Sequence, residues 1–253
     1  MTLFVQPIRF TDNVDTMAKF LAALGLSVSL TSDKGGWTVL AGATGTVALH
    51  SAADATSEAK PGSTSLSFEE TALDELARRL VATGFGDAGH PGESMVYDEA
   101  YGRAISITLG GEELVVNGQS DDLYGYTSTG VEPGVGDLRV SPIRFVDDQG
   151  PDRRLLEALG FRVVGKASEH FTGLALPGVG GSVGLHPTSD EARVIPGPFA
   201  VQLSFETATP LAEVIERVTA VGTAATLHES PWGDHVSITD PDGQPVLVHA
   251  APA

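Results

Sequence analysis

The sequence predicts an α+β fold made of four strand–helix–strand–strand–strand modules, paired into two tandem domains. Two observations support this prediction. Short sequences of the first half recur in the second half, in the same order and about 135 residues later. Each half also contains two helical patterns, each preceded by one strand signal and followed by three. A single module is too small to bury one face of its own sheet, so we expect the modules to pair.

The internal repeat also sets the expected domain boundaries. The recurring sequences are PIRF at 7–10 and 142–145, TVALH at 46–50 and SVGLH at 182–186, LSFE at 66–69 and 203–206, and ISIT at 105–108 and VSIT at 236–239. They predict one domain over residues 1–120 and a second over 138–253. Residues 121–137 are rich in Gly, Ser, Thr and Asp, which is typical of a linker.

The elements of the first half follow from caps and from alternation. Asp12 or Asn13 is a suitable N-cap for a helix that ends at Gly25, since glycine favours the position after a helix. A second amphipathic helix is expected before Gly84. The expected strands cover 4–10, 26–31, 37–41, 46–50, 63–68, 95–97, 104–108 and 114–117, and the second helix covers 72–83.

The second half repeats this order and ends in a hairpin. Helices are expected over 152–159 and 211–221, each followed by glycine. Strands over 236–239 and 246–249 flank the sequence Asp-Pro-Asp-Gly at 240–243. Pro241 presets φ for an early turn position, and Gly243 supplies a positive φ without steric cost.

Composition excludes several classes of protein. The 253 residues include no cysteine, which rules out disulfides, thiolate metal sites and a cysteine nucleophile. The formal net charge of −18 makes nucleic acid and anionic membrane poor partners. There is no apolar run of the ~18 residues that a membrane span needs, and the N-terminus lacks a signal-peptide pattern. These features predict a cytoplasmic protein.

Taken together, the modules resemble the vicinal oxygen chelate superfamily, which includes glyoxalase I, extradiol dioxygenases and bleomycin-resistance proteins. The likeness lies in RFTD at 9–12 leading to LGL at 24–26, in RFVD at 144–147 leading to LGF at 159–161, and in the WG and DPDG pairs at 232–233 and 240–243. It implies two glyoxalase-like domains, each a U-shaped eight-stranded mixed sheet with helices outside and a ligand cleft on the concave side. Function needs a separate argument, because one fold serves many activities.

The resemblance also implies where a metal ion would be held. Metal-dependent members use His and Glu at the start of the first strand and the middle of the last strand of each paired module. Those positions here are Val5, Ala48, Ser63 and Val115, and Val140, Gly184, Ala200 and Leu247. None carries an imidazole or a carboxylate, so we expect no metal centre of the family kind and no other cofactor.

Side-chain alternation predicts what lines the two clefts instead. If Ile8 and Phe10 pack against the helices, Arg9 faces the cleft, and Arg144 does so in the second half. The expected ligand-binding residues are Arg9, Trp37, His50, Tyr101, Asn117, Arg144, Phe171, His186, Trp232 and His249. In this interpretation the aromatic rings stack on a planar ligand and an arginine pairs with its acidic group. The alternative is that each arginine instead satisfies a carboxylate or strand-end carbonyls in the protein, and that the histidines and aromatic rings are structural.

Two functions remain open at this point. The first is a small-molecule binding protein for an antibiotic or an aromatic metabolite, as in drug-sequestering resistance proteins. The second is an enzyme of lyase or dioxygenase type, either without a metal or with a displaced metal site, that uses cleft histidines. We favour the first. No feature of the sequence favours a scaffold for a protein partner. The sequence fits either a monomer with internally paired domains or a homodimer.

Overall fold

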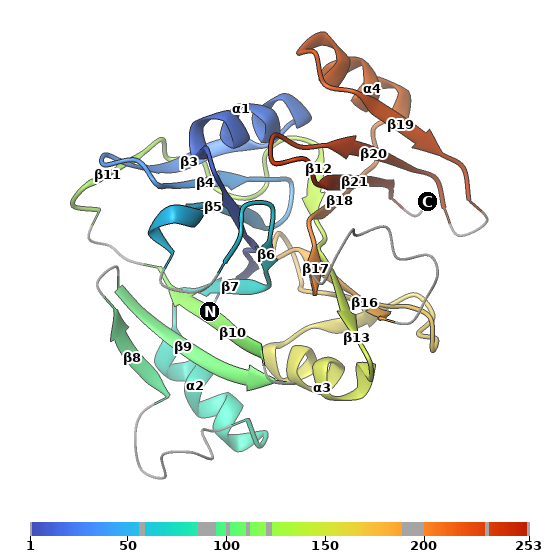
Figure 1. Ribbon diagram of the computed structural model, residues 1–253. Helices are drawn as coiled ribbons and strands as arrows, with labels where there is room; N and C mark the ends of the chain where they lie inside the picture. Colours follow the sequence, from blue (N-terminus) through green and yellow to red (C-terminus); the bar gives the residue numbers. More distant parts are fainter. Residues whose placement is uncertain are drawn as a thin grey trace.

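The computed structural model describes residues 2–55, 59–85, 95–99, 102–109, 112–119, 123–188, 200–230 and 233–251 (Figure 1). Four α-helices lie in this part of the chain, one for each predicted module: α1 (Val14–Leu24), α2 (Leu73–Ala82), α3 (Gln149–Leu159) and α4 (Leu211–Ala220). Each has 10 or 11 residues. Within the described ranges, no helix has the length and apolar character that a membrane crossing demands.

The helices begin and end where the caps predict. The Asn13 side chain accepts a hydrogen bond from the Thr16 backbone N–H at the start of α1, and Gly25 closes the helix with a φ of 126°. Helix α3 begins earlier than the expected residue 152. Its N-cap is Asp148, whose carboxylate accepts a hydrogen bond from the Gly150 N–H at 2.8 Å.

The strands form four sheets that pair as two U-shaped halves. In the N-terminal half, sheet A has the order β1-β7-β10-β9-β8 and sheet B the order β11-β3-β4-β5-β2-β6. Their strands are β1 (Leu3–Val5), β2 (Ile8–Thr11), β3 (Ser27–Ser32), β4 (Trp37–Ala41), β5 (Thr46–Ser51), β6 (Thr64–Ser65), β7 (Ser67–Glu70), β8 (Val96–Glu99), β9 (Gly102–Leu109), β10 (Glu112–Gly118) and β11 (Tyr126–Ser128), with a 3₁₀ turn η1 (Ala52–Asp54) after β5.

The C-terminal half repeats this topology. Sheet C has the order β12-β18-β21-β20-β19 and sheet D the order β14-β15-β16-β13-β17. Their strands are β12 (Leu138–Val140), β13 (Ile143–Val146), β14 (Arg162–Val164), β15 (Thr172–Ala175), β16 (Ser182–Pro187), β17 (Val201–Gln202), β18 (Ser204–Thr207), β19 (Ala225–His228), β20 (His235–Thr239) and β21 (Pro245–Ala250). The predicted α+β class and the arrangement of paired modules are thereby confirmed.

The first strand of every module is split between two sheets, where the sequence predicts one continuous strand. Residues 4–10 form β1, which pairs with β7 in sheet A, and β2, which pairs with β5 in sheet B. The break falls at Gln6 and Pro7, and proline has no backbone N–H to donate to a ladder. Strands β6 and β7, β12 and β13, and β17 and β18 are divided in the same way.

The segment 121–137, expected to be a linker, contains regular structure. Strand β11 pairs antiparallel with β3 and extends sheet B at its edge. The hydroxyl of Thr129 donates to the Val28 carbonyl oxygen at 2.7 Å. Farther along, the Asp137 carboxylate accepts hydrogen bonds from Arg217 of α4. This connection is therefore bound to both halves.

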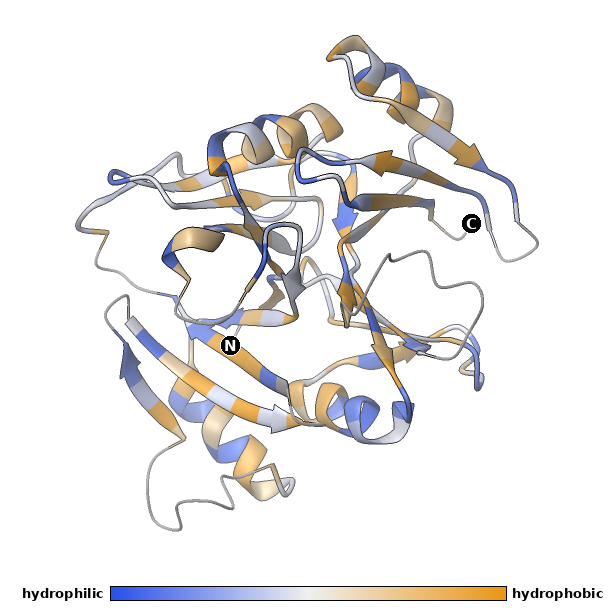
Figure 2. Ribbon diagram, in the orientation of Figure 1, coloured by the Kyte–Doolittle hydropathy of each residue, from blue (hydrophilic) through white to orange (hydrophobic). Residues whose placement is uncertain are grey.

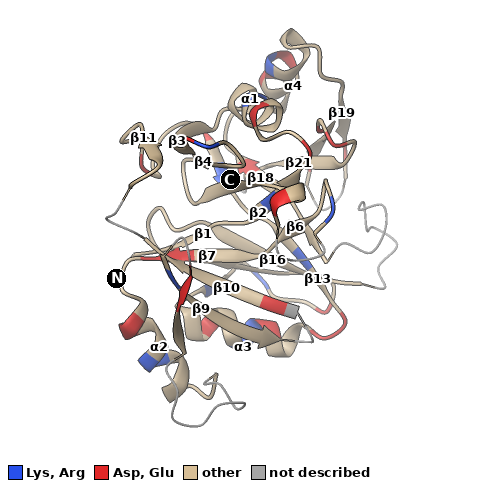
Figure 3. Ribbon diagram, turned by 60° about the vertical axis from the view of Figure 1, so that its left-hand side comes forward, with Lys and Arg blue, Asp and Glu red and all other residues tan. Residues whose placement is uncertain are grey.

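The two halves share one hydrophobic core. Apolar residues of all four helices and of all four sheets belong to a single cluster, and polar and apolar residues alternate along residues 105–109 of β9 (Figure 2). Helix α1 contacts α4, and α2 contacts α3 (Figure 1). Across the second contact, Phe68 and Phe161 meet edge to face with ring centroids 5.7 Å apart. Acidic residues lie on both halves (Figure 3), as the charge distribution along the sequence predicts.

Candidate functional site

Each sheet has a helix side, whose residues belong to the core, and an opposite side that we call its inner face. In sheet B, Leu40, Val47 and Leu49 lie on the helix side. The register places Phe10 beside His50 and Trp37 beside His50, so these three rings share the inner face. His50 lies 5.6 Å from the Phe10 ring and 5.5 Å from the Trp37 ring, centroid to centroid.

Sheet D repeats this aromatic group on its own inner face. Phe145 pairs in register with His186, and their ring centroids are 5.3 Å apart. Phe171 is 44% exposed and its ring lies over Gly184. A β-carbon built on Gly184 would come within 2.8 Å of that ring, so only glycine leaves room for it. The structure therefore places His50 and His186 on the side that alternation predicts, and Trp37 and Phe171 lie on the same two faces.

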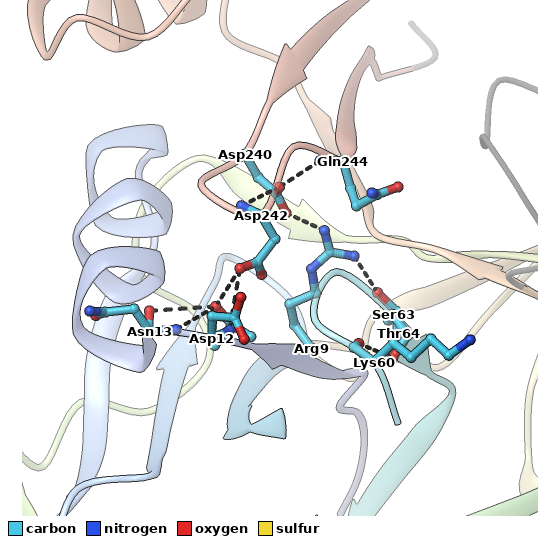
Figure 4. A network of polar contacts seen from close by, with 10 residues as sticks. Arg9, Asp12, Asn13, Lys60, Ser63, Thr64, Asp240, Asp242 and Gln244 are labelled. Carbon is cyan, nitrogen blue, oxygen red and sulfur yellow. Dashed lines mark hydrogen bonds and ion pairs between the residues drawn. The ribbon is translucent and has the colours of Figure 1, made fainter. Parts of the chain in front are cut away.

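Arg9 lies on the opposite side from the one that the sequence predicts. The register pairs Arg9 with Leu49, so its side chain points to the helix side, and Phe10 takes the inner face. Arg9 is 3% exposed and forms an ion pair with Asp240 of the β20–β21 turn, while its Nη1 donates to the Thr64 hydroxyl at 3.0 Å (Figure 4). The prediction assumes that Ile8 and Phe10 pack against the helices, but both lie on the inner face beside Ala48 and His50. Alternation therefore places Arg9 on the helix side, as it does Val5.

The same turn is held to the N-terminal half by further contacts. The Asp240 carboxylate also accepts the backbone N–H groups of Asp242 and Gln244, at 3.0 and 2.8 Å. The Thr11 hydroxyl and the Asp12 N–H donate to the Asp242 carboxylate (Figure 4). The predicted Asp-Pro-Asp-Gly turn is confirmed, with Gly243 at a φ of 79°. Its main role in the structure is to join the two halves.

Arg144 is also engaged within the protein. It pairs in register with Leu185, on the helix side, and forms an ion pair with Asp152 of α3. The two side chains are 4% and 8% exposed. The prediction that Arg9 and Arg144 face a ligand is wrong, because each guanidinium is buried against a carboxylate.

A row of five side chains crosses the inner face of each remaining sheet. In sheet A the register aligns Phe4, Glu69, Asn117, Ala104 and Tyr97 on strands β1, β7, β10, β9 and β8. In sheet C the equivalent strands align Arg139, Glu206, His249, His235 and His228. The two rows keep one glutamate in common and differ at the other four positions.

The polar groups of the sheet A row are satisfied by one another. Gln6 donates from Nε2 to the Glu69 carboxylate, and Asn117 donates from Nδ2 to the Gln6 amide oxygen at 3.4 Å. Burial raises the pKa of the Glu69 carboxyl group, and the hydrogen bond from Gln6 opposes that rise. Asn117 lies on the inner face as predicted, within this closed network.

The sheet C row leaves a polar group unpaired. Ser141 stands where Gln6 stands in the first half, and its hydroxyl donates to the Glu206 carboxylate at 3.3 Å. The shorter serine does not bridge to His249, whose Nε2 is buried without a hydrogen-bond partner. Burial, with a smaller contribution from the neighbouring His235, lowers the pKa of His249 to about 4.

The other two histidines of the row also lie on strands. His228 ends β19 and His235 begins β20, and their rings stack with centroids 4.9 Å apart. His235 lies 5.3 Å from His249. Burial and the neighbouring His228 lower the pKa of His235. The alternation of HVSIT at 235–239, with Val236 and Ile238 in the core, is the sequence signal that places His235 on the inner face.

The inner faces of sheets C and D together are called the C-terminal inner face, and those of sheets A and B the N-terminal inner face. Gln202 is a second unpaired polar group on the C-terminal inner face, and the sequence did not reveal it. It pairs in register with Ile143, which shares the inner face with Gly184. Its side chain is 3% exposed, and its Nε2 has no hydrogen-bond partner. The equivalent residue of the first half is Ser65, which pairs with Ile8. In the N-terminal half, within the described residues, the unpaired buried side-chain atom on the inner face is the Thr46 hydroxyl, near the start of β5.

The inner faces do not fit the metal centre that the resemblance implies. Val5 and Val140 belong to the core on the helix side. The inner-face residues around the expected positions are Ile8, Ala48, Ser65, Ser67 and Val115 in the first half, and Ile143, Gly184, Gln202, Ser204 and Leu247 in the second. None offers an imidazole or a carboxylate. Among the described residues, no three His, Asp or Glu side chains converge in a way that could hold a metal ion.

Two predicted site residues, Tyr101 and Trp232, lie outside the described residues. Two surface hollows of about 460 and 490 Å³ lie away from the inner faces. The first is between α1 and the segments 221–224 and 239–241, and the second is beside the start of α2. Neither is lined by a predicted ligand-binding residue.

The buried imidazole makes the stability of the fold depend on pH. The pKa of His249 falls from 6.5 to about 4 on folding, so its contribution to stability is complete above pH 6.5 and is lost as the pH falls toward 4. We expect about 2 kcal/mol of unfolding free energy to be lost between pH 7 and pH 5 through this group. Urea denaturation of the wild type and of His249→Asn, which copies Asn117, measures it. Equal losses in the two proteins would contradict the assignment to His249.

Comparison with known proteins shows a likeness in structure. No family model matches the sequence, and the curated proteins gave no match either. Among solved structures, a catechol 2,3-dioxygenase aligns with a TM-score of 0.58 and 16% identity over 98% of this chain and 86% of its own. The 2,3-dioxygenase LapB from Pseudomonas sp. KL28 aligns with a TM-score of 0.58 and 14% identity over 99% and 91%.

An extradiol ring-cleaving dioxygenase from B. fuscum aligns with a TM-score of 0.61 and 14% identity, over 99% of this chain and 71% of its own. Identities this low establish the fold and leave the activity open. They agree with the sheet topology, in which two pairs of modules each form a U. The chain therefore has the vicinal oxygen chelate fold in two tandem copies, as the sequence predicts.

Proposed function

We propose that the protein binds a small planar organic molecule, such as an aromatic metabolite or an antibiotic, on the inner face of its C-terminal half, without the metal ion that the resemblance implies. The observation that carries this proposal is the pair of unpaired nitrogens, Gln202 Nε2 on the inner face of sheet D and His249 Nε2 on the inner face of sheet C. A buried polar group without a partner costs roughly 1–3 kcal/mol. A ligand that offers an acceptor to the Gln202 amide and a hydrogen-bond partner to the His249 imidazole removes that cost, so both atoms favour an occupied site.

The aromatic group of sheet D supports a planar ligand. The Phe171 ring is 44% exposed and lies over Gly184, and Phe145 and His186 lie on the same face. Exposed ring faces bind other planar groups by stacking, with roughly 0.5–1.5 kcal/mol beyond the area buried. The N-terminal inner face is the weaker candidate, because Gln6, Glu69 and Asn117 already satisfy one another.

A thermal-shift screen tests the proposal. The wild type is heated with a panel of planar aromatic compounds and, separately, with Zn²⁺, Ni²⁺, Mn²⁺ and Fe²⁺. A compound at a hundred times its Kd should stabilise the protein by about 2.7 kcal/mol. We expect hits among the aromatic compounds, weakened in Gln202→Ser, which copies Ser65, and retained in the reciprocal variant Ser65→Gln.

The outcomes separate binding from catalysis. If no compound raises the melting temperature, the binding proposal fails. A metal ion that raises it and binds in a one-to-one ratio would instead favour an enzyme with a displaced metal site. In that case the histidines of sheet C would be the first residues to replace.

A further inference from the structure

The two inner-face rows differ in one consistent direction. From sheet A to sheet C, the equivalent residues change from Phe4 to Arg139, from Asn117 to His249, from Ala104 to His235 and from Tyr97 to His228. Every change introduces a cationic group or one that can take up a proton. The glutamate between them is kept, as Glu69 and Glu206. The C-terminal inner face has thus gained positive and protonatable groups on an otherwise equivalent scaffold.

The row holds a single carboxylate, Glu206, against one guanidinium and three imidazoles. Glu206 accepts a hydrogen bond from Ser141, and no ion pair is found between Glu206 and Arg139 among the described residues. Arg139 is exposed at the outer end of the row. Gln202 adds an amide donor that has no acceptor. This face therefore offers more donors than acceptors, which suits a ligand that carries negative charge.

We infer that the molecule bound at the C-terminal inner face carries an anionic oxygen group, a carboxylate or a phenolate, which lies along the imidazole row and is bound together with a proton taken up by that row. This inference rests on the proposed function. Imidazoles that are neutral in the free protein become charged when an anion is placed beside them, because the anion favours the protonated form. The other charged groups of the row are Arg139 and Glu206, and Asp234 lies beside His235.

Matched pairs of ligands test the charge directly. The full chain is titrated calorimetrically with 2-naphthoate and with the neutral 2-naphthamide, at pH 6.5 and pH 8, in two buffers of different ionisation enthalpy. We expect the carboxylate to bind at least about tenfold more tightly than the amide at pH 6.5, which corresponds to 1.4 kcal/mol. Its advantage should shrink at pH 8, and the heat should depend on the buffer, since protons are taken up.

Variants that copy the first half identify the residues. Arg139→Phe and His235→Ala should each reduce the preference for the carboxylate, and His235→Ala should also reduce the proton uptake. The introduced phenylalanine and alanine are the residues that sheet A has at the equivalent positions, Phe4 and Ala104. Asn117→His gives the N-terminal half the imidazole that His249 supplies in the C-terminal half. It should alter neither the preference for the carboxylate nor the proton uptake.

The two proposals fail in different ways. If the amide binds as tightly as the carboxylate, or if binding takes up no proton, the anionic ligand is excluded and the binding function stands. If neither member of the pair binds and the aromatic panel of the thermal-shift screen gives no hit, both proposals fall. Tight binding of the carboxylate that is unaffected by Arg139→Phe and His235→Ala would place the anion elsewhere and overturn the inference.

Discussion

Replacing Asp240 by alanine is expected to lower the free energy of unfolding by about 3–5 kcal/mol, because it leaves the Arg9 guanidinium buried without its carboxylate. Arg9 is 3% exposed, and the Asp240 side chain is fully buried in the ion pair. The same change removes the acceptor for the backbone N–H groups of Asp242 and Gln244. The midpoint of urea denaturation, with the slope held to the wild-type value, measures the loss.

The exposed pair between Arg103 and Asp74 is the matched control. Its side chains are 50% and 67% exposed, so solvent screens the interaction and Asp74→Ala should leave the midpoint almost unchanged. The double variant Arg9→Leu/Asp240→Leu should recover much of the loss, because replacing both charges leaves no unpaired ion. A single Asp240→Ala variant as stable as Asp74→Ala would refute the idea that this pair holds the halves together.

Filling the floor of the C-terminal inner face is expected to have the largest effect on ligand binding. In Gly184→Val the new side chain occupies the space of the Phe171 ring, whose nearest atom would lie 2.8 Å from the added β-carbon. Because Phe171 is 44% exposed, its ring can swing toward solvent. A displaced ring no longer offers its stacking surface, which contributes roughly 0.5–1.5 kcal/mol beyond the area buried, so we expect aromatic compounds to bind roughly two- to tenfold more weakly.

The equivalent position in the first half supplies the control. Ala48→Val fills the N-terminal inner face, where Ala48 pairs in register with Ile8, and it should leave binding unchanged. Calorimetric affinities for the best hit of the screen decide between the two halves, with circular dichroism as a check on folding. If Ala48→Val abolishes binding and Gly184→Val does not, the ligand belongs to the other inner face.

The fold could be predicted because local signals and the internal repeat agree. The cap at Asn13, the glycines that end the helices and the turn at Gly243 each determine the local backbone on their own. Alternation also placed Asn117 and His249 correctly, since their strands run without a break. The orientation of Arg9 was not predicted because Ile8 and Phe10, although apolar, lie on the inner face, and a pattern of apolar residues does not reveal that both faces of β2 are partly apolar.

The candidate site depends on contacts between strands, which the sequence of a single strand does not reveal. The partner of Arg9 is Asp240, 231 residues away in the sequence. Gln202 and His249 become informative only when the structure shows that no neighbour reaches their nitrogens. The contrast between the rows of sheets A and C likewise needs the register of five strands. Sequence alone gives the residues of such a row without their order in space.

The divided first strands have a consequence for how the chain folds. Leu3 pairs with Glu70 in sheet A, while Arg9 pairs with Leu49 and Thr64 in sheet B. Neither sheet of the N-terminal half can therefore be completed until residues from both modules are available. Such long loops must close before their contacts are formed, which slows folding and makes it cooperative. During synthesis the smallest segment that can form a native-like sheet is a pair of modules. A single module that emerges alone leaves the edges of its strands unpaired.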